Sequence, residues 1–192
     1  MTKPFIVGFG GTTRAASTSE RLVGAVLAEA EHLGAQTRLF GGLALAALPH
    51  YAPEKPGRSP EQLAFLDAVR HADALVIATP AYHGGMSGLV KNAIDLIADL
   101  QNDERIFLDG RAVGLIAAAG GWQGAGVTLS AMRDMVHALR GWPTPVGIAT
   151  GGTVYDSDGV LVDKATRNAV ADQARQLVEF SESWTVRLKM AM

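Results

Sequence analysis

The 192-residue chain has no cysteine, which excludes disulfides, zinc-thiolate sites, iron–sulfur clusters and cysteine nucleophiles. It has no apolar run approaching the ~20 residues that a membrane-spanning helix needs. The chain also lacks an excess of either charge, because 17 basic and 19 acidic residues leave a formal net charge of −2. We therefore expect no nucleic-acid partner and no membrane insertion. The N-terminal residues lack the apolar core and cleavage site of a signal peptide, which favours a cytoplasmic location.

The chain does contain many hydrophobic residues, 48% of the total, gathered in short continuous runs. Four of these runs show no alternation of polar and apolar residues: Phe5–Phe9, Leu75–Ala78, Val113–Ala117 and Val146–Ala149. Continuous runs of this length are typical of strands buried on both faces of a parallel sheet. The shorter and more polar stretch Thr37–Phe40 suits an outer strand.

Between the runs, apolar residues recur with the period of a helix. The predicted helices cover residues 22–33, 60–69, 89–97, 132–139 and 170–178. Ser17 and Glu20 have capping-box spacing before the first of them, and Ser59 and Pro60 open the second. Alternating strands and helices predict an α/β fold: a single domain over residues 1–192 with a three-layer, doubly wound, five-stranded parallel sheet.

One irregular segment, Gly41 to Arg58, is long for a compact domain. Segments of this kind are usually functional or lie at an interface. Its apolar residues favour an anchored segment over a loose surface insertion: Leu43, Leu45, Leu48 and Tyr51.

The loop after the first strand, residues 10–19, combines glycines, five hydroxyl side chains and Arg14 with the start of a helix. Free N–H groups, the helix dipole and a guanidinium together favour an anion such as a phosphate. The alternative is that the hydroxyls only cap the helix. A P-loop is excluded because no Gly-Lys-Ser/Thr sequence occurs. The dinucleotide fingerprint is weak, since Thr13 holds the third glycine position and Phe40-Gly41 follows where an acidic residue is needed.

Two further glycine-containing loops follow central strands. Residues 79–88 include Pro80, Tyr82 and His83, and residues 119–126 begin at the end of the next strand. Ligands of open α/β sheets bind at such carboxyl ends, where glycine lets the backbone approach closely. A hydrolase with His83 as base and Ser87 as nucleophile is disfavoured because no Gly-x-Ser-x-Gly elbow exists. The alternative for the loop at 119–126 is a flexible turn into the next helix.

Two of these loops carry a family resemblance that runs over nearly the whole chain. Gly11–Ser17 resembles the G-S-x-R-x-x-S loop of the NADPH-dependent FMN reductases, and Thr79–Asp95 resembles their motif T-P-x-Y-x-x-x-x-x-G-x-L-K-N-x-x-D. Thr12 replaces the usual serine but keeps the hydroxyl. Val90 separates Leu89 from Lys91, where the family often has leucine directly before lysine.

The resemblance implies a flavodoxin-like fold with strand order 2-1-3-4-5 and FMN as the cofactor. The FMN phosphate would lie on Thr12, Arg14, Ser17 and Ser19. The flavin ring would lie against residues of the second loop, with its pyrimidine edge near the third: Pro80, Ala81, Tyr82, His83, Gly84, Gly85, Gly120 and Gly121. Tyr82, His83 and Trp122 are the planar side chains expected to border the open flavin face.

The implied activity is hydride transfer from NADPH or NADH to the flavin and on to free flavin, a quinone or another small electron acceptor. No side chain is expected to act as a catalytic acid or base and no metal is expected, because the cofactor carries the chemistry. The family also implies a homodimer or homotetramer, with residues 41–58 or the helix at 89–97 at the interface. Two alternatives are a flavodoxin-type electron carrier, which the near-neutral charge disfavours, and a binding protein that has lost its flavin.

Overall fold

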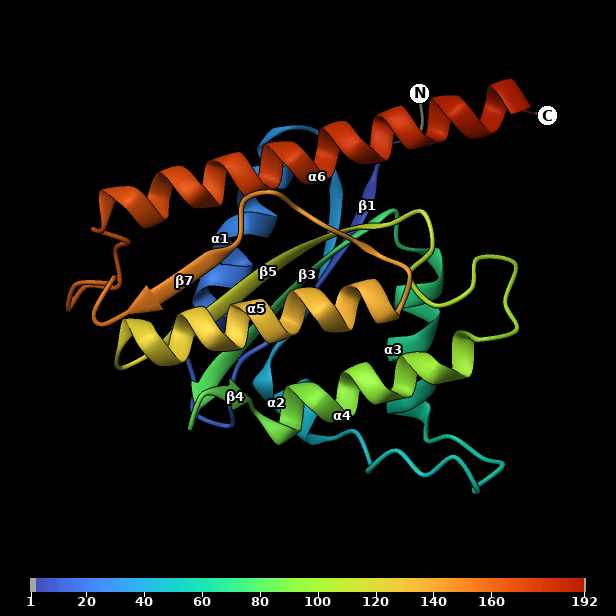
Figure 1. The fold of residues 1–192 in the computed structure, drawn as a ribbon, viewed down its shortest axis with the longest axis horizontal. Coiled ribbons are helices and arrows are strands. Elements are labelled where there is room, and N and C mark those ends of the chain that lie inside the picture. Colours follow the sequence, from blue (N-terminus) through green and yellow to red (C-terminus); the bar gives the residue numbers. More distant parts are fainter. Residues whose placement is uncertain (1–2, 192) are drawn as a thin grey trace.

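The computed structural model describes the backbone of residues 3–191 and the side chains of residues 3–184. Within them, one sheet lies between helices (Figure 1). The elements in chain order are β1 Phe5–Gly10, α1 Thr18–His32, β2 Gln36–Phe40, α2 Gly42–Ala46, α3 Pro60–His71, β3 Ala74–Tyr82, β4 Gly85–Met86, α4 Gly88–Leu96 followed by a 3₁₀ turn Ile97–Leu100, β5 Ala112–Ala119, α5 Trp122–Ala138, β6 Trp142–Pro143, β7 Ile148–Gly151 and α6 Lys164–Ala191.

The strands of the main sheet are parallel and lie in the order β2-β1-β3-β5-β6, with β7 also paired to β5. This is the flavodoxin-like arrangement predicted from the sequence. Two details differ from the prediction. The fifth position is shared by β6 and β7, which pair with the beginning and the end of β5, and β4 adds a short antiparallel hairpin to β3.

The break between β6 and β7 has a physical cause in side chains from two helices. The Arg133 guanidinium of α5 donates to the carbonyl oxygens of Thr144 and Pro145 at 3.1 and 3.2 Å. The Val146 N–H donates to Gln176 Oε1 of α6 at 3.0 Å. Backbone groups that would extend a strand are thus bonded to side chains, and Pro145 has no N–H to offer. The predicted strand Val146–Ala149 accordingly begins only at Ile148.

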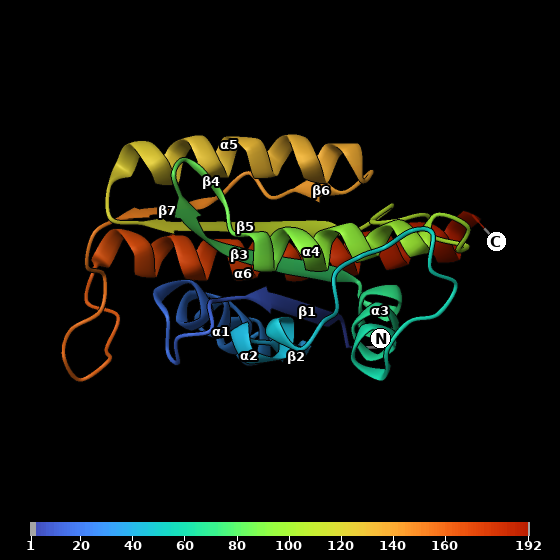
Figure 2. The same cartoon turned by 90° about the horizontal axis from the view of Figure 1, so that it is seen from below.

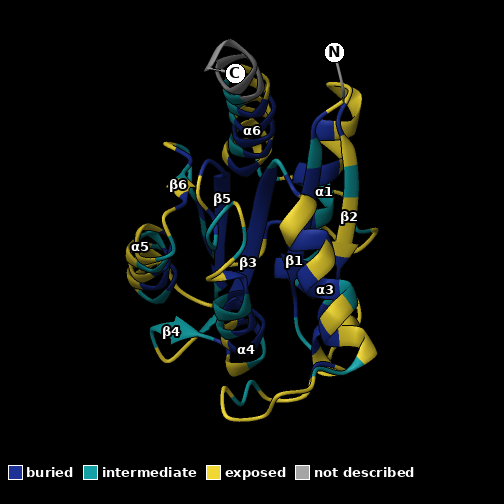
Figure 3. Cartoon of the chain, turned by 90° about the vertical axis from the view of Figure 1, so that its right-hand side faces the viewer, coloured by how far each residue is buried: buried dark blue, intermediate teal, exposed yellow. Residues whose placement is uncertain are grey.

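Two apolar layers flank the sheet. On one face, α1 and α6 bury Leu22, Val26 and Leu177. On the other, α3 to α5 bury Phe65, Ile94 and several smaller side chains against the strands. Figure 3 shows α6 above the buried strands β3 and β5, α4 below them and α5 to their left. The predicted three-layer α/β architecture is confirmed.

The helix starts follow the sequence signals only in part. Ser17 caps α1, accepting from the Glu20 N–H at 3.4 Å, but the Glu20 carboxylate does not complete a capping box and turns toward Gly42. Ser59 and Gln62 do form a reciprocal box at α3. None of the helices in the described part of the chain is long and apolar enough to span a lipid bilayer.

The segment 41–58 is fastened to its own domain. Leu45 and Leu48 are buried, whereas Leu43 is 70% exposed on α2, so the prediction that Leu43 anchors the segment is wrong. Asn92 of α4, a residue of the second motif, accepts from the Tyr51 N–H at 2.8 Å and donates to the carbonyl oxygens of Leu48 and Pro49. Asn92 therefore has a structural role in this motif.

The amino end of the sheet is closed by Arg111, which is fully buried. Its guanidinium donates to the carbonyl oxygens of Ala72, Phe107 and Arg70 at 3.0, 2.9 and 2.7 Å. Burial, together with the nearby positive charge of Arg105, lowers the pKa of Arg111 to about 10. The Arg111 guanidinium therefore links three backbone carbonyl groups that lie outside the strands.

Candidate functional site

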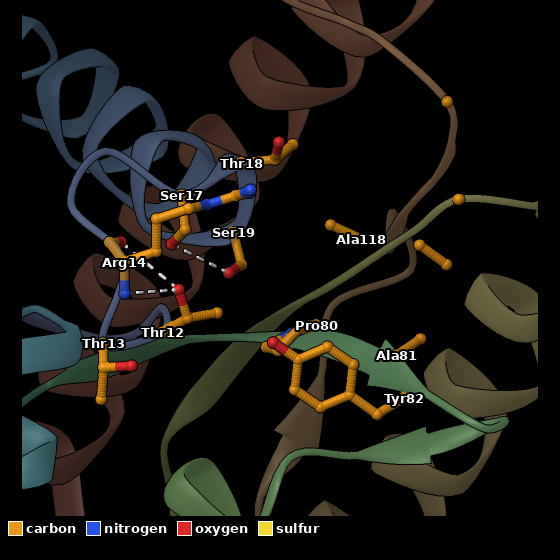
Figure 4. A pocket seen from close by; sticks show the side chains of 13 residues that line it. Thr12, Thr13, Arg14, Ser17, Thr18, Ser19, Pro80, Ala81, Tyr82 and Ala118 are labelled. Atoms are coloured by element: carbon orange, nitrogen blue, oxygen red, sulfur yellow. Dashed lines mark hydrogen bonds between the residues drawn. The ribbon is translucent and has the colours of Figure 1, made fainter.

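A cavity of about 480 Å³ opens at the carboxyl edge of the sheet. The loops after β1, β3, β5 and β7 meet there, as expected for an open parallel sheet. Its lining residues are Thr12, Thr13, Arg14, Ser17, Thr18, Ser19, Pro80, Ala81, Tyr82, Ala118, Ala119, Gly120 and Gly152. Figure 4 shows the hydroxyl and guanidinium groups on one side and Pro80, Ala81 and Tyr82 on the other.

The loop after β1 turns sharply into α1. The Arg14 N–H donates to Thr12 Oγ1 at 3.1 Å, which closes a local turn. Gly10 and Gly11 have φ angles of +154° and +117°, and a Cβ atom on Gly10 would overlap the Ala78 carbonyl group. Only glycine fits at this close approach, so β1 can lead directly into a loop that bends over the sheet.

Polar groups of this loop face the cavity from the start of α1. Ser17 and Ser19 are each only 2% exposed, and their Oγ atoms lie 3.5 Å apart (Figure 4). Arg14 is exposed, and its guanidinium makes no hydrogen bond or ion pair with any residue that the structure describes. A helix start, hydroxyl donors and a free guanidinium form an environment suited to a phosphate group.

The loop after β3 is a tight hairpin. His83 and Gly84 have φ angles of +53° and +79°, so they form the two-residue turn between Tyr82 and Gly85, which pair across it. The buried Thr79 hydroxyl fixes the base of the hairpin, because it accepts from the Ser87 N–H at 2.9 Å and donates to the Pro80 carbonyl oxygen at 2.9 Å. The hairpin is therefore held at its base and projects at its tip.

The structure divides the expected second-loop residues into two groups. Pro80, Ala81 and Tyr82 line the cavity, while His83, Gly84 and Gly85 are absent from its lining. Tyr82 is 56% exposed and also borders a neighbouring hollow of about 200 Å³ beside the start of α4. Ser87, the alternative nucleophile, is buried and caps α4 by accepting from the Val90 N–H at 3.3 Å.

The third loop contributes less than the glycine pattern predicts. Gly120 lines the cavity, but Gly121 is the residue before α5 and is outside the lining. Trp122 is 67% exposed and its backbone and ring lie against Gly151. Gly152 lines the cavity and was not among the expected site residues. The sequence does hold a signal, since Gly151 and Gly152 come one residue after the apolar run that ends at Ala149.

The segment between β7 and α6 reaches past the carboxyl ends of the strands toward α1 (Figure 2). Arg21 of α1 donates to the Gly159 carbonyl oxygen, and its guanidinium carbon lies 3.9 Å from the centre of the Tyr155 ring. Burial raises the pKa of Tyr155, although the positive Arg21 opposes this. Among the described residues, no group of three histidine or acidic side chains could hold a metal ion.

Comparison with known proteins gives a consistent result. The family model described as NADPH-dependent FMN reductase matches residues 4–155. The FMN-dependent NADPH-azoreductase of Staphylococcus haemolyticus (strain JCSC1435) is 38% identical over 109 residues, or 57% of this chain and 52% of the relative. The FMN reductase (NADPH) of Pseudomonas aeruginosa is 29% identical over 183 residues, or 92% of this chain and 94% of the relative. The chain thus spans about half the length of the staphylococcal protein and nearly all of the pseudomonad one.

Solved structures agree on the fold. The NAD(P)H:(acceptor) oxidoreductase FerB from Paracoccus denitrificans superimposes with a TM-score of 0.75 at 21% identity, covering 94% of this chain and 98% of that one. A flavodoxin, WrbA-like protein from Agrobacterium tumefaciens gives a TM-score of 0.62 at 17% identity, with coverages of 95% and 99%. At these identities the likeness establishes the flavodoxin-like fold alone.

Proposed function

Because the chain belongs to the NADPH-dependent FMN reductase family, we propose that it is a single flavodoxin-like domain over residues 1–192 that uses FMN to oxidise NADPH or NADH. The electrons pass to a small-molecule acceptor. The observation that carries this proposal is the polar cavity at the carboxyl edge of the sheet. In it, the hydroxyl side chains at the start of α1 lie opposite the end of β3. Its volume of about 480 Å³ lies within the range of ordinary small-molecule and cofactor sites.

The residues at the start of α1 fit the phosphate of FMN. Arg14 would supply charge, and the hydroxyls of Thr12, Ser17 and Ser19 would supply hydrogen bonds. Ser17 and Ser19 are nearly fully buried, so a charged group bonded to them would be largely withdrawn from water, where such bonds are strong. The Arg14 guanidinium reinforces this assignment, because it has no partner among the side chains that the structure describes.

The opposite wall of the cavity would receive the flavin ring. We assign this contact to Pro80–Gly85, with Gly120 and Gly121 at the pyrimidine edge. In support of this assignment, four of these residues line the cavity: Pro80, Ala81, Tyr82 and Gly120. Four residues of the assignment are not in the cavity lining, so the flavin ring would have to extend past the cavity to contact them: His83, Gly84, Gly85 and Gly121. The planar side chains Tyr82 and Trp122 are the exposed groups that would border a flat partner.

When bound, FMN supplies the redox chemistry, taking hydride from the nicotinamide and passing electrons to free flavin, a quinone or another acceptor. The chain's own residues bind the phosphate, orient the ring and leave one side of the cavity open. Hydride transfer needs reacting atoms about 3–3.5 Å apart, so orientation is the main contribution of the protein. No side chain is assigned a proton-transfer role.

An anaerobic titration tests this function. FMN-loaded protein should lose its visible flavin absorbance when NADPH or NADH is added, and a quinone or an azo dye should restore it. Protein that binds no FMN would contradict the flavoenzyme assignment. Protein that binds FMN but is reduced by neither nicotinamide would instead be an electron carrier.

We also propose a homodimer or homotetramer with residues 41–58 or α4 at the interface. The exposed Leu43 on α2 supports this surface, since it is apolar and 70% accessible, and α2 lies next to α4. Sedimentation at micromolar concentration should give a species heavier than the monomer. A fully active monomer under those conditions would contradict the proposal.

A further inference from the structure

One carboxylate lies beneath the proposed phosphate site without lining it. Glu20 is in the first turn of α1, and its N–H donates to Ser17 Oγ at 3.4 Å. Its side chain leaves the helix and accepts from the Gly42 N–H at 2.8 Å, 22 residues further along the chain. Gly42 is the first residue of α2 and Gly41, the residue before it, provides no side-chain cap. Glu20 thus fills from α1 the capping role at the start of α2.

Three glycines close around this carboxylate. A Cβ atom on Gly11 would lie 2.7 Å from Glu20 Oε2, and one on Gly41 would lie 3.0 Å from the Glu20 Cδ. A Cβ atom on Gly42 would overlap the carbonyl group of Thr12. The start of α2 therefore lies directly on the Thr12 backbone, a contact that requires glycine at position 42, while Gly11 and Gly41 leave room for the Glu20 carboxylate.

We propose that Glu20 is a positioning residue for phosphate binding, an inference that rests on the proposed function. By bonding the Gly42 N–H, it holds α2 against the backbone of Thr12. That contact fixes the turn in which Thr12 Oγ1 accepts from the Arg14 N–H. The Thr12 hydroxyl and the Arg14 side chain are thereby presented to the cavity in one arrangement.

Glu20 cannot act on the phosphate directly. An ionised carboxylate only accepts hydrogen bonds, and a phosphate at neutral pH offers mainly acceptor oxygens. Two anions would also repel each other. Its bond to the Gly42 N–H gives the Glu20 carboxylate a partner of suitable polarity, so its contribution reaches the ligand through the backbone of the loop.

The test compares two ligands that differ only in the phosphate. FMN and riboflavin affinities are measured by quenching of flavin fluorescence in the wild-type protein, Glu20→Ala and Glu20→Gln. Misplacement of the loop should remove the equivalent of one hydrogen bond to the charged phosphate, so Glu20→Ala should bind FMN about tenfold more weakly, with riboflavin affinity unchanged. Glu20→Gln keeps an acceptor oxygen and should recover most of the FMN affinity.

Matched variants complete the design. Glu29→Ala, on the solvent side of the same helix, should leave both affinities unchanged. Gly42→Ala should mimic Glu20→Ala by pushing α2 off Thr12, which keeps the proposal testable if Glu20→Ala does not fold. An unchanged FMN affinity in folded Glu20→Ala overturns the proposal, and so does an equal loss for both ligands. If the wild-type protein binds FMN no better than riboflavin, the proposed phosphate site itself is wrong.

Discussion

The two ends of the sheet use arginine in opposite ways. At the amino end, Arg111 is fully buried and its guanidinium is bonded to three backbone carbonyl groups. At the carboxyl end, Arg14 is exposed, and its guanidinium has no partner among the described residues. The same side chain therefore closes the fold at one end and is available to a ligand at the other.

The difference shows how a ligand-binding arginine can be distinguished from a structural one. A buried guanidinium must have its donors satisfied, because an unpaired charge away from water is very costly. An exposed guanidinium can remain unpaired at little cost, since water solvates it. The contrast predicts that changes at the amino end alter stability, whereas changes at the carboxyl end alter FMN binding.

The largest expected effect is at Arg111. Arg111→Met fills similar space but removes a donor from three carbonyl groups. Ala72 keeps the Arg105 guanidinium as a second donor at 3.3 Å, whereas the partly buried carbonyl groups of Phe107 and Arg70 lose their partner, at about 1–3 kcal/mol each. We expect the free energy of unfolding, measured in urea, to fall by about 2 kcal/mol or more. Arg70→Met is the matched control at the same end, because Arg70 is in a partly exposed ion pair with Asp103 and should cost under about 1 kcal/mol.

If Arg111→Met and the wild-type protein had comparable free energies of unfolding, the stabilising role of Arg111 at the amino end of the sheet would be wrong. A folded Arg111→Met protein should still bind FMN with wild-type affinity. Weakened FMN binding by that variant would link the two ends, which the separation of the sites along the strands does not predict.

Arg14→Ala should give the next largest effect, confined to binding. Loss of a charge-assisted hydrogen bond worth about 1.5–3 kcal/mol should weaken FMN binding roughly 10- to 150-fold. The free energy of unfolding should change by less than about 0.5 kcal/mol, as for most surface substitutions. Arg175→Ala, an exposed arginine of α6, is the control. Equal FMN affinity of Arg14→Ala and the control would refute the phosphate assignment.

Tyr155 tests the comparison in another way, because it lies beyond the carboxyl ends of the strands but is expected to affect stability. Its pKa is raised in the folded protein, so the stability it contributes is complete below about pH 10, its unfolded value, and is lost as the pH rises through the folded pKa. Urea unfolding between about pH 9 and 11 should therefore show a steeper loss for the wild-type protein than for Tyr155→Phe. The two slopes would coincide if the hydroxyl were as accessible in the folded protein as in the unfolded chain.

The smallest effect is expected at His83. Its φ of +53° is a conformation that asparagine tolerates better than most side chains. His83→Asn should raise stability by a few tenths of a kcal/mol, a size consistent with turn optimisation. FMN affinity should be unchanged, and stopped-flow flavin reduction should keep its rate and pH profile. Abolished reduction with FMN still bound would make His83 a proton-transfer residue.

The sequence predicted the main strands because burial on both faces leaves a direct trace. Phe5–Phe9 and Val113–Ala117 are continuous apolar runs, and the structure places them in β1 and β5. The divided fifth strand left no such trace. Its break depends on Arg133 and Gln176, which come from helices before and after it in the chain. Periodicity within a window cannot detect partners of this kind.

The candidate site shows the same limit. The loop at residues 10–19 could be recognised because its hydroxyls and glycines are consecutive. The hairpin at His83 and Gly84 could not be predicted, because His-Gly is not among the Asn-Gly, Asp-Gly or Gly-Gly pairs that usually mark a two-residue turn. The role of Glu20 could not be inferred from spacing, because the same Ser17–Glu20 pattern also predicts a capping box. Only the position of Gly42 in space distinguishes the two.

The interrupted fifth strand also bears on how this edge of the sheet avoids strand addition by another molecule. An exposed sheet edge invites strand addition by another molecule and can seed aggregation. Here the edge offers two residues in β6 and four in β7. Pro143 and Pro145 have no amide hydrogen to donate, and Arg133 occupies the carbonyl groups between the two strands. An incoming strand would find no continuous ladder, so the break acts as a guard against open-ended polymerisation.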